Sequence, residues 1–578
     1  MESSKSHSGP KPGDITKSRV STLRRLSASA KRSHLSALAL CESLVEGSAT
    51  HRGLNQFFNN LTARDRHYWI ASLYALLMPK GQRRKLSAYF TPPHLAQHAL
   101  QVLLDNGIVP GKDRILDPAS GGAAFLAPLA AWIADVRRKA GDVPKEIISK
   151  INRTIAGIEI DPELARLSEF LLEDILRGEL AQSRKRLNVS IKQSDTLSLR
   201  PRPAFDAVIA NPPYGRVFRP EEKLLSDFSD VITDSYVNRY ALFIKQALGW
   251  VKPDGVVCLI IPMSFLGGPY FSSLREYILS NASVISLDPI EQRSELFLDV
   301  LCDVCVLTIR KLGVKKGMDS PTSSLLRFHA VPQKLGSLDI PATACGRIWA
   351  LPNVAHSEKF FESGYESLES YGYTVKTGYF VWNREQHRYR TGFKPKANEF
   401  PLYWAHNVRA NSICKPLANH PSDDDDTIGF AAIDKSSTAI VHSDAVIVQR
   451  TSNSRQKRRL IAAIIRQRGV PGRRGFVSEN HTILIIPSPG KTQSISLKVL
   501  CRLLNSEAVD SRFRRISGTV SVSVSALKAL PLPLSKFVNL TFDKCPDDDC
   551  AANSAYLLSE SEDTLRPTSG GQRAGVSP

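Results

Sequence analysis

The stretch VIANPPYGRV, residues 208–217, ends an apolar run with Asn211, Pro212, Pro213 and Tyr214. Proline cannot continue a central strand, because it lacks an amide hydrogen and its ring fixes φ. A strand that stops in two prolines therefore forms a stiff turn whose carbonyl oxygens can accept hydrogen bonds from outside the chain. The sequence predicts a binding site at this turn.

Polar clusters also follow three other apolar runs. DPASGG begins at Asp117, EID begins at Glu159, and SDT contains Asp195. In an open parallel sheet, ligands bind in the crevice beyond the carboxyl ends of the strands. Together with the Asn211 turn, these clusters predict one ligand site at one edge of a sheet.

The residue types favour a nucleoside that carries no phosphate. Gly121 and Gly122 allow close approach of backbone to a ligand, but this turn has neither the GxGxxG nor the GK[ST] pattern of pyrophosphate sites. A carboxylate at Glu159 can accept both ribose hydroxyls, and Asp195 can accept from an adenine amino group. S-Adenosylmethionine fits these groups. A structural glycine turn and carboxylates that only cap helices are the alternatives.

Short β-rich runs alternate with amphipathic helices up to about residue 312, which predicts a doubly wound α/β sheet. The expected strands are 114–117, 154–160, 188–194, 205–210, 255–262, 283–288 and 303–310. A helix is expected over 161–178, with Asp161 as N-cap, Pro162 at its first position and Gly178 at its end. A further helix around 144–151 must fill the long gap between Asp117 and Glu159.

The composition predicts two structured domains with loose ends. Residues 1–35 read as a disordered basic tail, 36–320 as the α/β domain with a helical N-terminal part, 325–535 as a mixed α+β domain, and 540–578 as a disordered tail. The net charge of +20 favours a polyanionic partner. No apolar run approaches the roughly 18 to 20 residues of a membrane span.

Nine cysteines without a framework spacing are typical of a reducing compartment. The closest pair, Cys302 and Cys305, falls in an alternating β-branched run, and no second ligand pair follows. A strand explains this pair better than metal binding, and we expect no metal site.

The motifs SAYFTPPHLAQHAL, DPASGGAAFL, GIEID and NPPYG, in that order, resemble those of adenine-N6 DNA methyltransferases of type II restriction-modification systems. In that family the cofactor motifs precede the target motif and a recognition domain follows. VIVQRTS, VSENHTILIIP and LLNSEAVDSRFRR are similar to the specificity domains of such enzymes. The resemblance covers about residues 85–535 and implies the S-adenosylmethionine-dependent methyltransferase fold, with a mostly parallel seven-stranded sheet.

The resemblance also implies site residues. The expected S-adenosylmethionine contacts are Tyr89, Thr91, Asp117, Ala119, Ser120, Gly121, Gly122, Glu159, Ile160, Asp195 and Thr196. The expected catalytic residues are Asn211, Pro212, Pro213, Tyr214 and Phe271, with Tyr270 as the second choice for Phe271. The Asn211 side-chain oxygen and the Pro212 carbonyl would accept from the amino group of a flipped-out adenine, and Tyr214 would stack on its ring.

Double-stranded DNA is the expected partner. The expected DNA contacts of the second domain are Arg450, Arg455, Lys457, Arg458, Arg459, Arg473, Arg474, Arg512, Arg514 and Arg515. The resemblance further implies a monomer in the bacterial cytoplasm, with a cognate restriction endonuclease on a separate chain. The alternatives are a cytosine-N4 DNA methyltransferase, a protein-glutamine methyltransferase, and a silent DNA-binding specificity protein.

Overall fold

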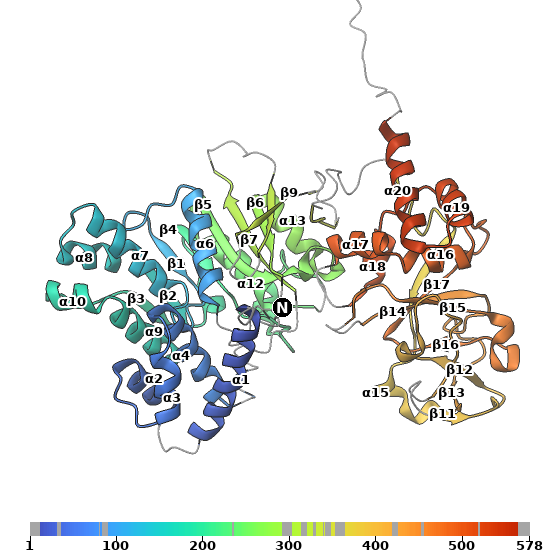
Figure 1. Ribbon diagram of the computed structural model, residues 1–578, viewed down its shortest axis with the longest axis horizontal. Coiled ribbons are helices and arrows are strands. Elements are labelled where there is room, and N and C mark those ends of the chain that lie inside the picture. The colour runs from blue at the N-terminus through green and yellow to red at the C-terminus, as the bar shows by residue number, and fades with distance from the viewer. Residues whose placement is uncertain are drawn as a thin grey trace, which may run out of the picture. The chain divides into compact units, whose positions relative to one another are not determined.

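A computed structural model of the chain separates two compact units (Figure 1). Unit 1 comprises Met1–Phe265, Tyr270–Leu338 and Ala342–Gly346, and unit 2 comprises Leu266–Pro269, Asp339–Pro341 and Arg347–Pro578. The structure describes residues 12–31, 36–79, 81, 83, 91–233, 236–291, 303–313, 321–326, 331–338, 340, 348–352, 364–418, 426–451, 456–517 and 521–564.

Unit 1 is built on a nine-stranded sheet with the order β3-β2-β1-β4-β5-β7-β6-β8-β9. Its strands are β1 Ile115–Asp117, β2 Ile155–Glu159, β3 Ser190–Gln193, β4 Phe205–Ala210, β5 Val251–Pro262, β6 Ala282–Pro289, β7 Val304–Lys311, β8 Thr322–Leu325 and β9 Gln333–Ser337. The seven predicted strands are confirmed. Neighbours from β3 to β5 pair in parallel, whereas β7 is antiparallel to both β5 and β6.

The extra strands β8 and β9 correct the predicted domain boundary. β8 pairs with β6 and β9 pairs with β8, so the residues of these two strands, which follow the predicted end of the first domain at 320, extend its sheet. Thr322–Leu325 is too short and polar a strand to stand out by alternation.

Parallel pairing brings the polar strand ends together. Asp117 pairs with Gly157 across β1 and β2, and Glu159 pairs with Gln193 across β2 and β3. β4 is buried along almost its whole length and ends at Ala210. The carboxyl ends of β1, β2, β3 and β4 therefore lie at one edge, as the sequence predicts.

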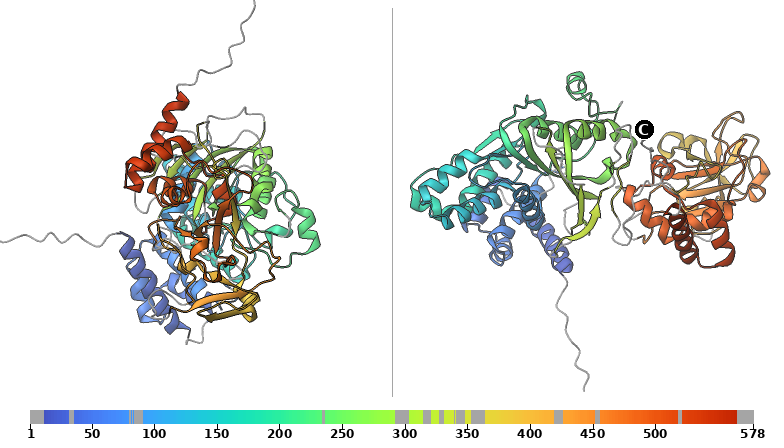
Figure 2. Two further views of the ribbon diagram at one scale, coloured as in Figure 1. Left: turned by 90° about the vertical axis from the view of Figure 1, so that its right-hand side faces the viewer. Right: turned by 90° about the horizontal axis from the view of Figure 1, so that it is seen from above.

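Helices flank this sheet (Figures 1 and 2). They are α6 Pro93–Asp105, α7 Leu126–Lys139, α8 Pro144–Thr154, α9 Pro162–Ile175, α10 Arg177–Ser183, α11 Glu222–Asp227, α12 Arg239–Trp250 and α13 Ser272–Asn281, with 3₁₀ turns η1 Thr196–Ser198, η2 Met263–Phe265 and η3 Pro269–Phe271. α8 is the helix that the long gap required.

The predicted start of α9 is confirmed and its predicted end is wrong. The Asp161 side chain accepts from the amides of Glu163 and Leu164, and Pro162 opens the helix. The helix breaks at Leu176, and α10 then carries Gly178 in its first turn. Glycine lowers helix stability by only about 1 kcal/mol, so neighbouring packing decides where a helix ends.

The N-terminal segment corrects the predicted disordered tail. α1 Pro12–Ala30 packs beside α2 Ala37–Glu46, α3 Arg52–Asn59 and α4 Ala63–Leu77, which form the blue group in Figure 1. Leu23 and Ala30 are buried in an apolar cluster with Leu40, Leu54 and other residues of these helices. The Ser, Lys and Arg content concealed an apolar stripe at helical spacing.

Unit 2 contains two four-stranded sheets, ordered β10-β17-β14-β15 and β11-β13-β12-β16. Its strands are β10 Tyr373–Thr377, β11 Tyr389–Gly392, β12 Glu399–Tyr403, β13 Ile428–Ala432, β14 Ala445–Gln449, β15 Ala462–Ile465, β16 Val477–Ser478 and β17 Thr482–Pro487. The 3₁₀ turns are η4 Gln386–Arg388, η5 Ala405–Asn407, η6 Gln467–Gly469 and η7 Pro471–Arg473. The helices are α15 Trp382–Glu385, α16 Leu497–Leu504, α17 Glu507–Ile516, α18 Val524–Lys528, α19 Ser535–Lys544 and α20 Asp548–Thr564.

α20 corrects the second predicted tail. Its Ala551, Ala552, Ala555 and Tyr556 are buried in the main apolar cluster of unit 2. Their spacing of three and four places them on one face of the helix, which the surrounding acidic and serine residues obscured. Among the described residues, no helix is both long and apolar enough to cross a membrane.

Replacing Leu23 by alanine should lower the free energy of unfolding by about 2 to 5 kcal/mol, because it removes a buried side chain. Urea unfolding of the full chain measures this change, with Ser29→Ala on the exposed face of α1 as the control. An unchanged midpoint for Leu23→Ala would show that α1 does not pack on the other helices.

Candidate active site

A cavity of about 300 Å³ opens at the carboxyl ends of β1, β2 and β4. Its lining combines the predicted polar clusters with apolar side chains. The lining residues are Thr91, Asp117, Pro118, Ala119, Ser120, Gly121, Ala124, Phe125, Ile158, Glu159, Ile160, Leu164, Ser194, Asp195, Thr196, Leu197, Asn211, Pro213, Val217, Leu224, Arg239 and Phe243. Residues that lie up to about 150 positions apart in the sequence thus meet at one cavity.

The Asp117 carboxyl is fully buried in this wall. Its Oδ1 accepts from the amide of Ala119 at 3.0 Å, while its Oδ2 and the hydroxyl oxygen of Ser120 are buried without a hydrogen-bond partner among the described residues. Burial raises the pKa of Asp117 to about 8; the amide of Ala119 opposes this shift and Glu159 adds to it. Buried acceptors without partners are costly, so a ligand with hydrogen-bond donors would stabilise this wall.

Glu159 joins the end of β2 to the turn that follows β1. Its Oε2 accepts from the amide of Gly121 at 2.8 Å, and its Oε1 accepts from the amide of Asp161 at 3.0 Å. Burial raises the pKa of this carboxyl, against the effect of these two amides. Each oxygen keeps a second lone pair, so the carboxylate can still accept from two hydroxyls.

Ile160 follows Glu159 and is 51% exposed, although it is a large apolar residue that lines the cavity. An exposed apolar side chain in a cavity wall gains free energy when a ligand covers it. The contact of Ile160 with a cofactor stays a prediction.

Asp195 and Thr196 lie at the neighbouring strand end. Asp195 Oδ1 accepts from the amide of Leu197 at 2.9 Å and caps η1, while Thr196 donates from Oγ1 to the carbonyl of Pro118 at 2.6 Å. Gln246 of α12 donates to the carbonyl of Thr196 at 3.1 Å. Thr196 therefore braces the wall, whereas Asp195 has a second carboxylate oxygen for a ligand.

The Asn211 corner closes the other side of the cavity. The Tyr214 hydroxyl lies 2.5 Å from Asn211 Oδ1 and 3.0 Å from the carbonyl oxygen of Ile260 in β5. A hydroxyl has one proton, so the shorter contact to Asn211 is the stronger hydrogen bond. Asn211 and Pro213 line the cavity, but Pro212 and Tyr214 are buried behind them.

The structure corrects the expected role of Phe271. Its ring is only 5% exposed and stacks on Tyr240 at 5.4 Å, so it has no open face for a base in this conformation. The second choice, Tyr270, is 53% exposed. The sequence could not tell which of two adjacent aromatics faces the core, because η3 is irregular and has no helical periodicity.

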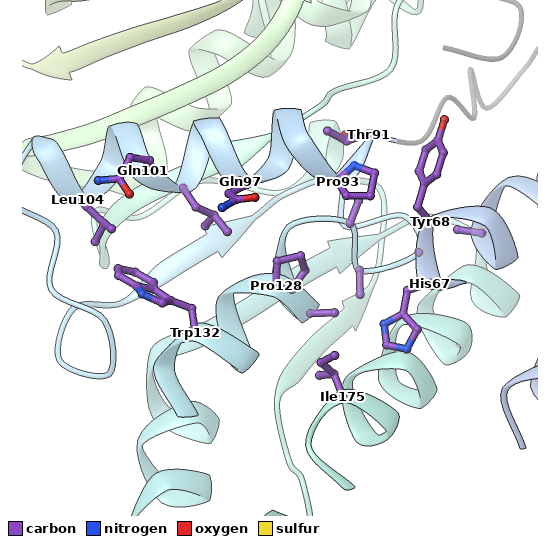
Figure 3. Close-up of a pocket in the computed structure, with 16 residues that line it drawn as sticks. His67, Tyr68, Thr91, Pro93, Gln97, Gln101, Leu104, Pro128, Trp132 and Ile175 are labelled. Atoms are coloured by element: carbon purple, nitrogen blue, oxygen red, sulfur yellow. The ribbon is translucent and has the colours of Figure 1, made fainter. Parts of the chain in front are cut away.

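A second cavity, of about 150 Å³, shares the lining residues Thr91 and Ala124 with the first (Figure 3). It is mostly apolar and lies among α4, α6 and α7, with Trp132 near one end and His67 near the other. Gly122, a predicted cofactor contact, lines this second cavity and not the polar one, whereas Thr91 lines both. Tyr89 lies outside the described residues.

Several cavity residues escaped the sequence analysis. Arg239 and Phe243 project from the first turns of α12, four positions apart, and Leu197 follows the Asp195 cluster. A pocket-facing residue on an amphipathic helix has the same spacing as a core residue, so Phe243 gave no separate signal. Arg239 carried a signal in the sequence, because it follows the N-cap Asn238 and a cation is unfavourable at the positive end of a helix.

The donors and acceptors of this cavity fit S-adenosylmethionine. Its ammonium group would satisfy the orphaned Asp117 oxygen, its ribose hydroxyls the free lone pairs of Glu159, and its adenine ring the apolar surface of Ile160 and Phe243. A cluster of carboxylates disfavours a phosphate at the same place. Among the described residues, no group of three or more His, Cys, Asp or Glu side chains is placed to hold a metal ion.

In unit 2 the structure contradicts two predicted DNA contacts. Arg512 is buried, its guanidinium lies 2.9 Å from Glu560, and it stacks over Tyr556 at 3.5 Å. Arg515 is also buried and donates to the carbonyl of Leu351 at 2.5 Å. These arginines are three apart on α17 and share its inward face with Phe513, so they stabilise the unit and cannot reach DNA.

Three other predicted contacts have partners for their side chains. Arg458 pairs with Asp549 at 2.8 Å and donates to the Asn505 carbonyl. Arg514 pairs with Asp510 at 2.7 Å, and Arg450 donates to the Asn480 carbonyl at 3.0 Å. The ion pairs of Arg458 and Arg514 reduce the positive charge available to phosphates. For Arg459 it is the backbone amide that donates to Asp510, at 2.6 Å, so a DNA contact of its side chain stays a prediction.

The remaining predicted contacts are the exposed Lys457 and Arg474, together with Arg473 and Arg455. The Arg473 side chain and the whole of Arg455 lie outside the described part of the chain. Lys457 and Arg474 keep the exposure that a phosphate contact needs.

Replacing Asp117 by asparagine should remove a pH-dependent loss of stability. The folded pKa of about 8 exceeds the ordinary value near 4, so the folded chain holds a proton that the unfolded chain releases between these values, and stability falls as pH rises through that window. Urea unfolding should therefore show Asp117→Asn gaining about 1 kcal/mol or more on the wild type between pH 5 and pH 8. The exposed Asp105→Asn is the control and should follow the wild type at every pH. If the unfolding free energies of Asp117→Asn and the wild type change with pH in the same way, Asp117 is not buried in its protonated form.

Comparison with known proteins agrees with the site. Residues 123–297 match the model of the Eco57I restriction-modification methylase family. The chain is 22% identical over 469 residues to the type II methyltransferase M.BsuBI of Bacillus subtilis, covering 78% of this chain and 88% of that protein. It is 24% identical over 346 residues to the type II methyltransferase M.PstI of Providencia stuartii, covering 57% of this chain and 65% of that protein.

Two solved structures share the fold of most of the chain. The restriction-modification enzyme MmeI, solved with DNA, aligns with a TM-score of 0.52 at 13% identity over 89% of this chain and 80% of that one. The enzyme LlaBIII, bound to DNA, aligns with a TM-score of 0.50 at 11% identity over 92% of this chain and 47% of that one. Residues 123–297, almost all of them in unit 1, thus resemble an Eco57I restriction-modification methylase domain.

Proposed function

We propose that the chain transfers a methyl group from S-adenosylmethionine to the N6 amino group of an adenine in double-stranded DNA, as the modification enzyme of a restriction-modification system. One observation carries this proposal: Asn211 lines the same cavity as Asp117 and Glu159. Acceptors for an amino group thus lie beside carboxylates suited to a nucleoside with a cationic tail. The similarity to type II methyltransferases supports DNA as the substrate.

The Asn211 corner would activate the amino group. An adenine amino nitrogen is a poor nucleophile, because its lone pair is delocalised into the ring. Asn211 Oδ1 and the Pro212 carbonyl would each accept one of its hydrogens and draw the nitrogen toward tetrahedral geometry. Acceptors fixed before the reaction stabilise the developing charge without reorganisation, which is where such sites gain most of their rate.

The Tyr214 ring is buried and does not line the cavity, so it has no open face for the predicted stacking on the base. Tyr214 supports this corner through its hydroxyl. The hydrogen bond to Asn211 Oδ1 fixes the orientation of the amide, whose oxygen can accept two hydrogen bonds. Tyr214 would thus position Asn211, and its own contact to Ile260 ties the corner to β5.

The remaining residues align the reactants. S-Adenosylmethionine supplies an electrophilic methyl carbon when it is bound. Asp117 and Glu159 would hold its two ends, so that the carbon faces Asn211, and such alignment contributes much of the acceleration. The adenine must leave the duplex to reach this place, at a cost of a few kcal/mol. Tyr270, the exposed aromatic of the Tyr270–Phe271 pair, is our candidate to offset that cost by stacking.

The proposal extends to the partners. The match to M.BsuBI spans 88% of a protein named as a methyltransferase, which supports a cognate endonuclease on a separate chain. We also propose that the chain acts as a monomer, because one active-site cavity and one copy of unit 2 suffice to bind DNA and modify one base.

Asn211→Ala should lower the rate of methyl transfer to DNA by about 100-fold to 1000-fold, since it removes one positioned acceptor. The measurement is incorporation of labelled methyl groups from S-adenosylmethionine, followed by separation of N6-methyladenine from N4-methylcytosine. The exposed Asn60→Ala serves as the control. Full activity of Asn211→Ala would exclude the proposed mechanism, and N4-methylcytosine as the product would replace adenine by cytosine.

Tyr214→Phe should keep the fold and cofactor affinity but lower kcat by about fivefold, because it deletes one hydrogen bond worth about 1 kcal/mol that orients Asn211. Single-turnover methylation and titration calorimetry with S-adenosylmethionine separate the two effects. A Tyr214→Phe variant with unchanged kcat would show that the ring alone matters.

A further inference from the structure

A row of aromatic rings and one guanidinium leads from the surface into the interior next to the Asn211 corner. The Phe218 ring is 79% exposed. The guanidinium of Arg216 lies 5.6 Å from its centroid and 5.3 Å from the centroid of Tyr236. Arg216 is therefore held between two rings.

The inner part of the row is anchored in the core. Tyr236 stacks on Tyr270 at 4.7 Å and meets the edge of Phe271 at 5.9 Å, and Phe271 stacks on the buried Tyr240. Tyr240 shares a hydrogen bond of 2.9 Å with Ser264. Each such ring pair contributes about 0.5 to 1.5 kcal/mol beyond burial, so the outer rings stand on a rigid base.

The backbone also fixes the row beside the site. Arg216 forms an antiparallel bridge with Asn238, the Val217 amide donates to the Val237 carbonyl at 2.8 Å, and the Arg239 amide donates to the Gly215 carbonyl at 3.0 Å. This short ladder follows the Asn211–Tyr214 corner directly and connects it to the start of α12. Arg216 and Phe218 are consequently displayed a few residues from the proposed base acceptor.

Single exposed apolar residues need no explanation, but this arrangement combines exposed rings with a cation. A guanidinium can stack on aromatic faces and can also bind phosphate in a bidentate way. Aromatic faces stack on any nucleobase, because every base has a π face. Because the row follows directly on the corner that would hold the everted base, a nucleic acid strand is the partner that it would meet there.

We propose that Arg216 and Phe218 bind the DNA strand around the everted nucleotide. Arg216 contacts a phosphate next to that nucleotide, and Phe218 stacks on a neighbouring base and stabilises the opened duplex. This inference rests on the proposed function, since it assigns the row to the same DNA substrate.

The two residues should fail in different ways. Phe218→Ala should weaken binding to a cognate duplex by about tenfold or more and reduce the 2-aminopurine signal of the flipped base, while the salt dependence of binding stays unchanged. Arg216→Ala should weaken binding and reduce the slope of log K against log salt by about 0.9, the effect of one phosphate contact. Fluorescence anisotropy over a salt series measures both.

Matched controls keep the test decisive. Phe393→Ala removes an equally exposed ring, 72% exposed, from unit 2 and should leave flipping unchanged. Calorimetry with S-adenosylmethionine and thermal unfolding should match the wild type for all variants. If Phe218→Ala binds and flips DNA within twofold of the wild type, or loses cofactor affinity in step, the inference is overturned.

The outcomes for the two proposals are distinguishable. If the wild type methylates no DNA but Phe218→Ala binds DNA more weakly than the wild type, the proposed reaction is wrong and the binding role of the row stands. If the wild type methylates DNA and both variants bind and flip DNA normally, the proposed reaction stands and the binding role of the row is wrong.

Discussion

The carboxylate of Glu159 accepts one backbone amide from the turn after β1 and another from the start of α9. These two hydrogen bonds fix the turn after β1 and the start of α9 against the end of β2. The cavity lies between the segments that they hold in place. Burying a carboxylate costs free energy unless its oxygens accept hydrogen bonds. Donors from a ligand would therefore stabilise Glu159 further, in addition to the two amides that it already holds. Asp117, one strand away, adds a second buried acid with an unused oxygen. The wall is therefore complementary to a ligand rich in hydroxyl and ammonium groups before any ligand arrives.

The sheet was predictable because its signals are local. Six of the seven strands contain apolar residues bounded by turn formers, whereas β3, with the sequence SIKQ, is mostly exposed. The helix α9 opens with a proline next to an aspartate cap. What escaped prediction depended on partners distant in sequence. α1 and α20 are polar overall and helical only because Leu23 and Tyr556 find apolar neighbours. β8 is too short for its own pattern and exists because β6 offers it an edge.

The residues of the site also divide into those with a local sequence signal and those whose position depends on packing. Asp117, Glu159, Asp195 and Asn211 follow strands, so strand prediction alone brought them together at the cavity. Residues on irregular or helical segments were less predictable: Phe271 is buried where Tyr270 is exposed, Gly122 faces the neighbouring cavity, and Phe243 gave no signal that separated it from the core. Side-chain direction in a turn depends on packing that a single sequence does not report.

The arginines of α17 carry a consequence for the whole chain. Arg512 pairs with Glu560 and Arg515 donates to a backbone carbonyl, both in the interior of unit 2. Arg514 and Arg458 form ion pairs with neighbouring acids. The acids in these ion pairs are already counted in the formal charge of +20, so that charge persists as a long-range attraction for a polyanion. Close contact with a polymer must then depend on the fewer cations that remain exposed, and discrimination between polymers comes from shape and contact more than from bulk attraction.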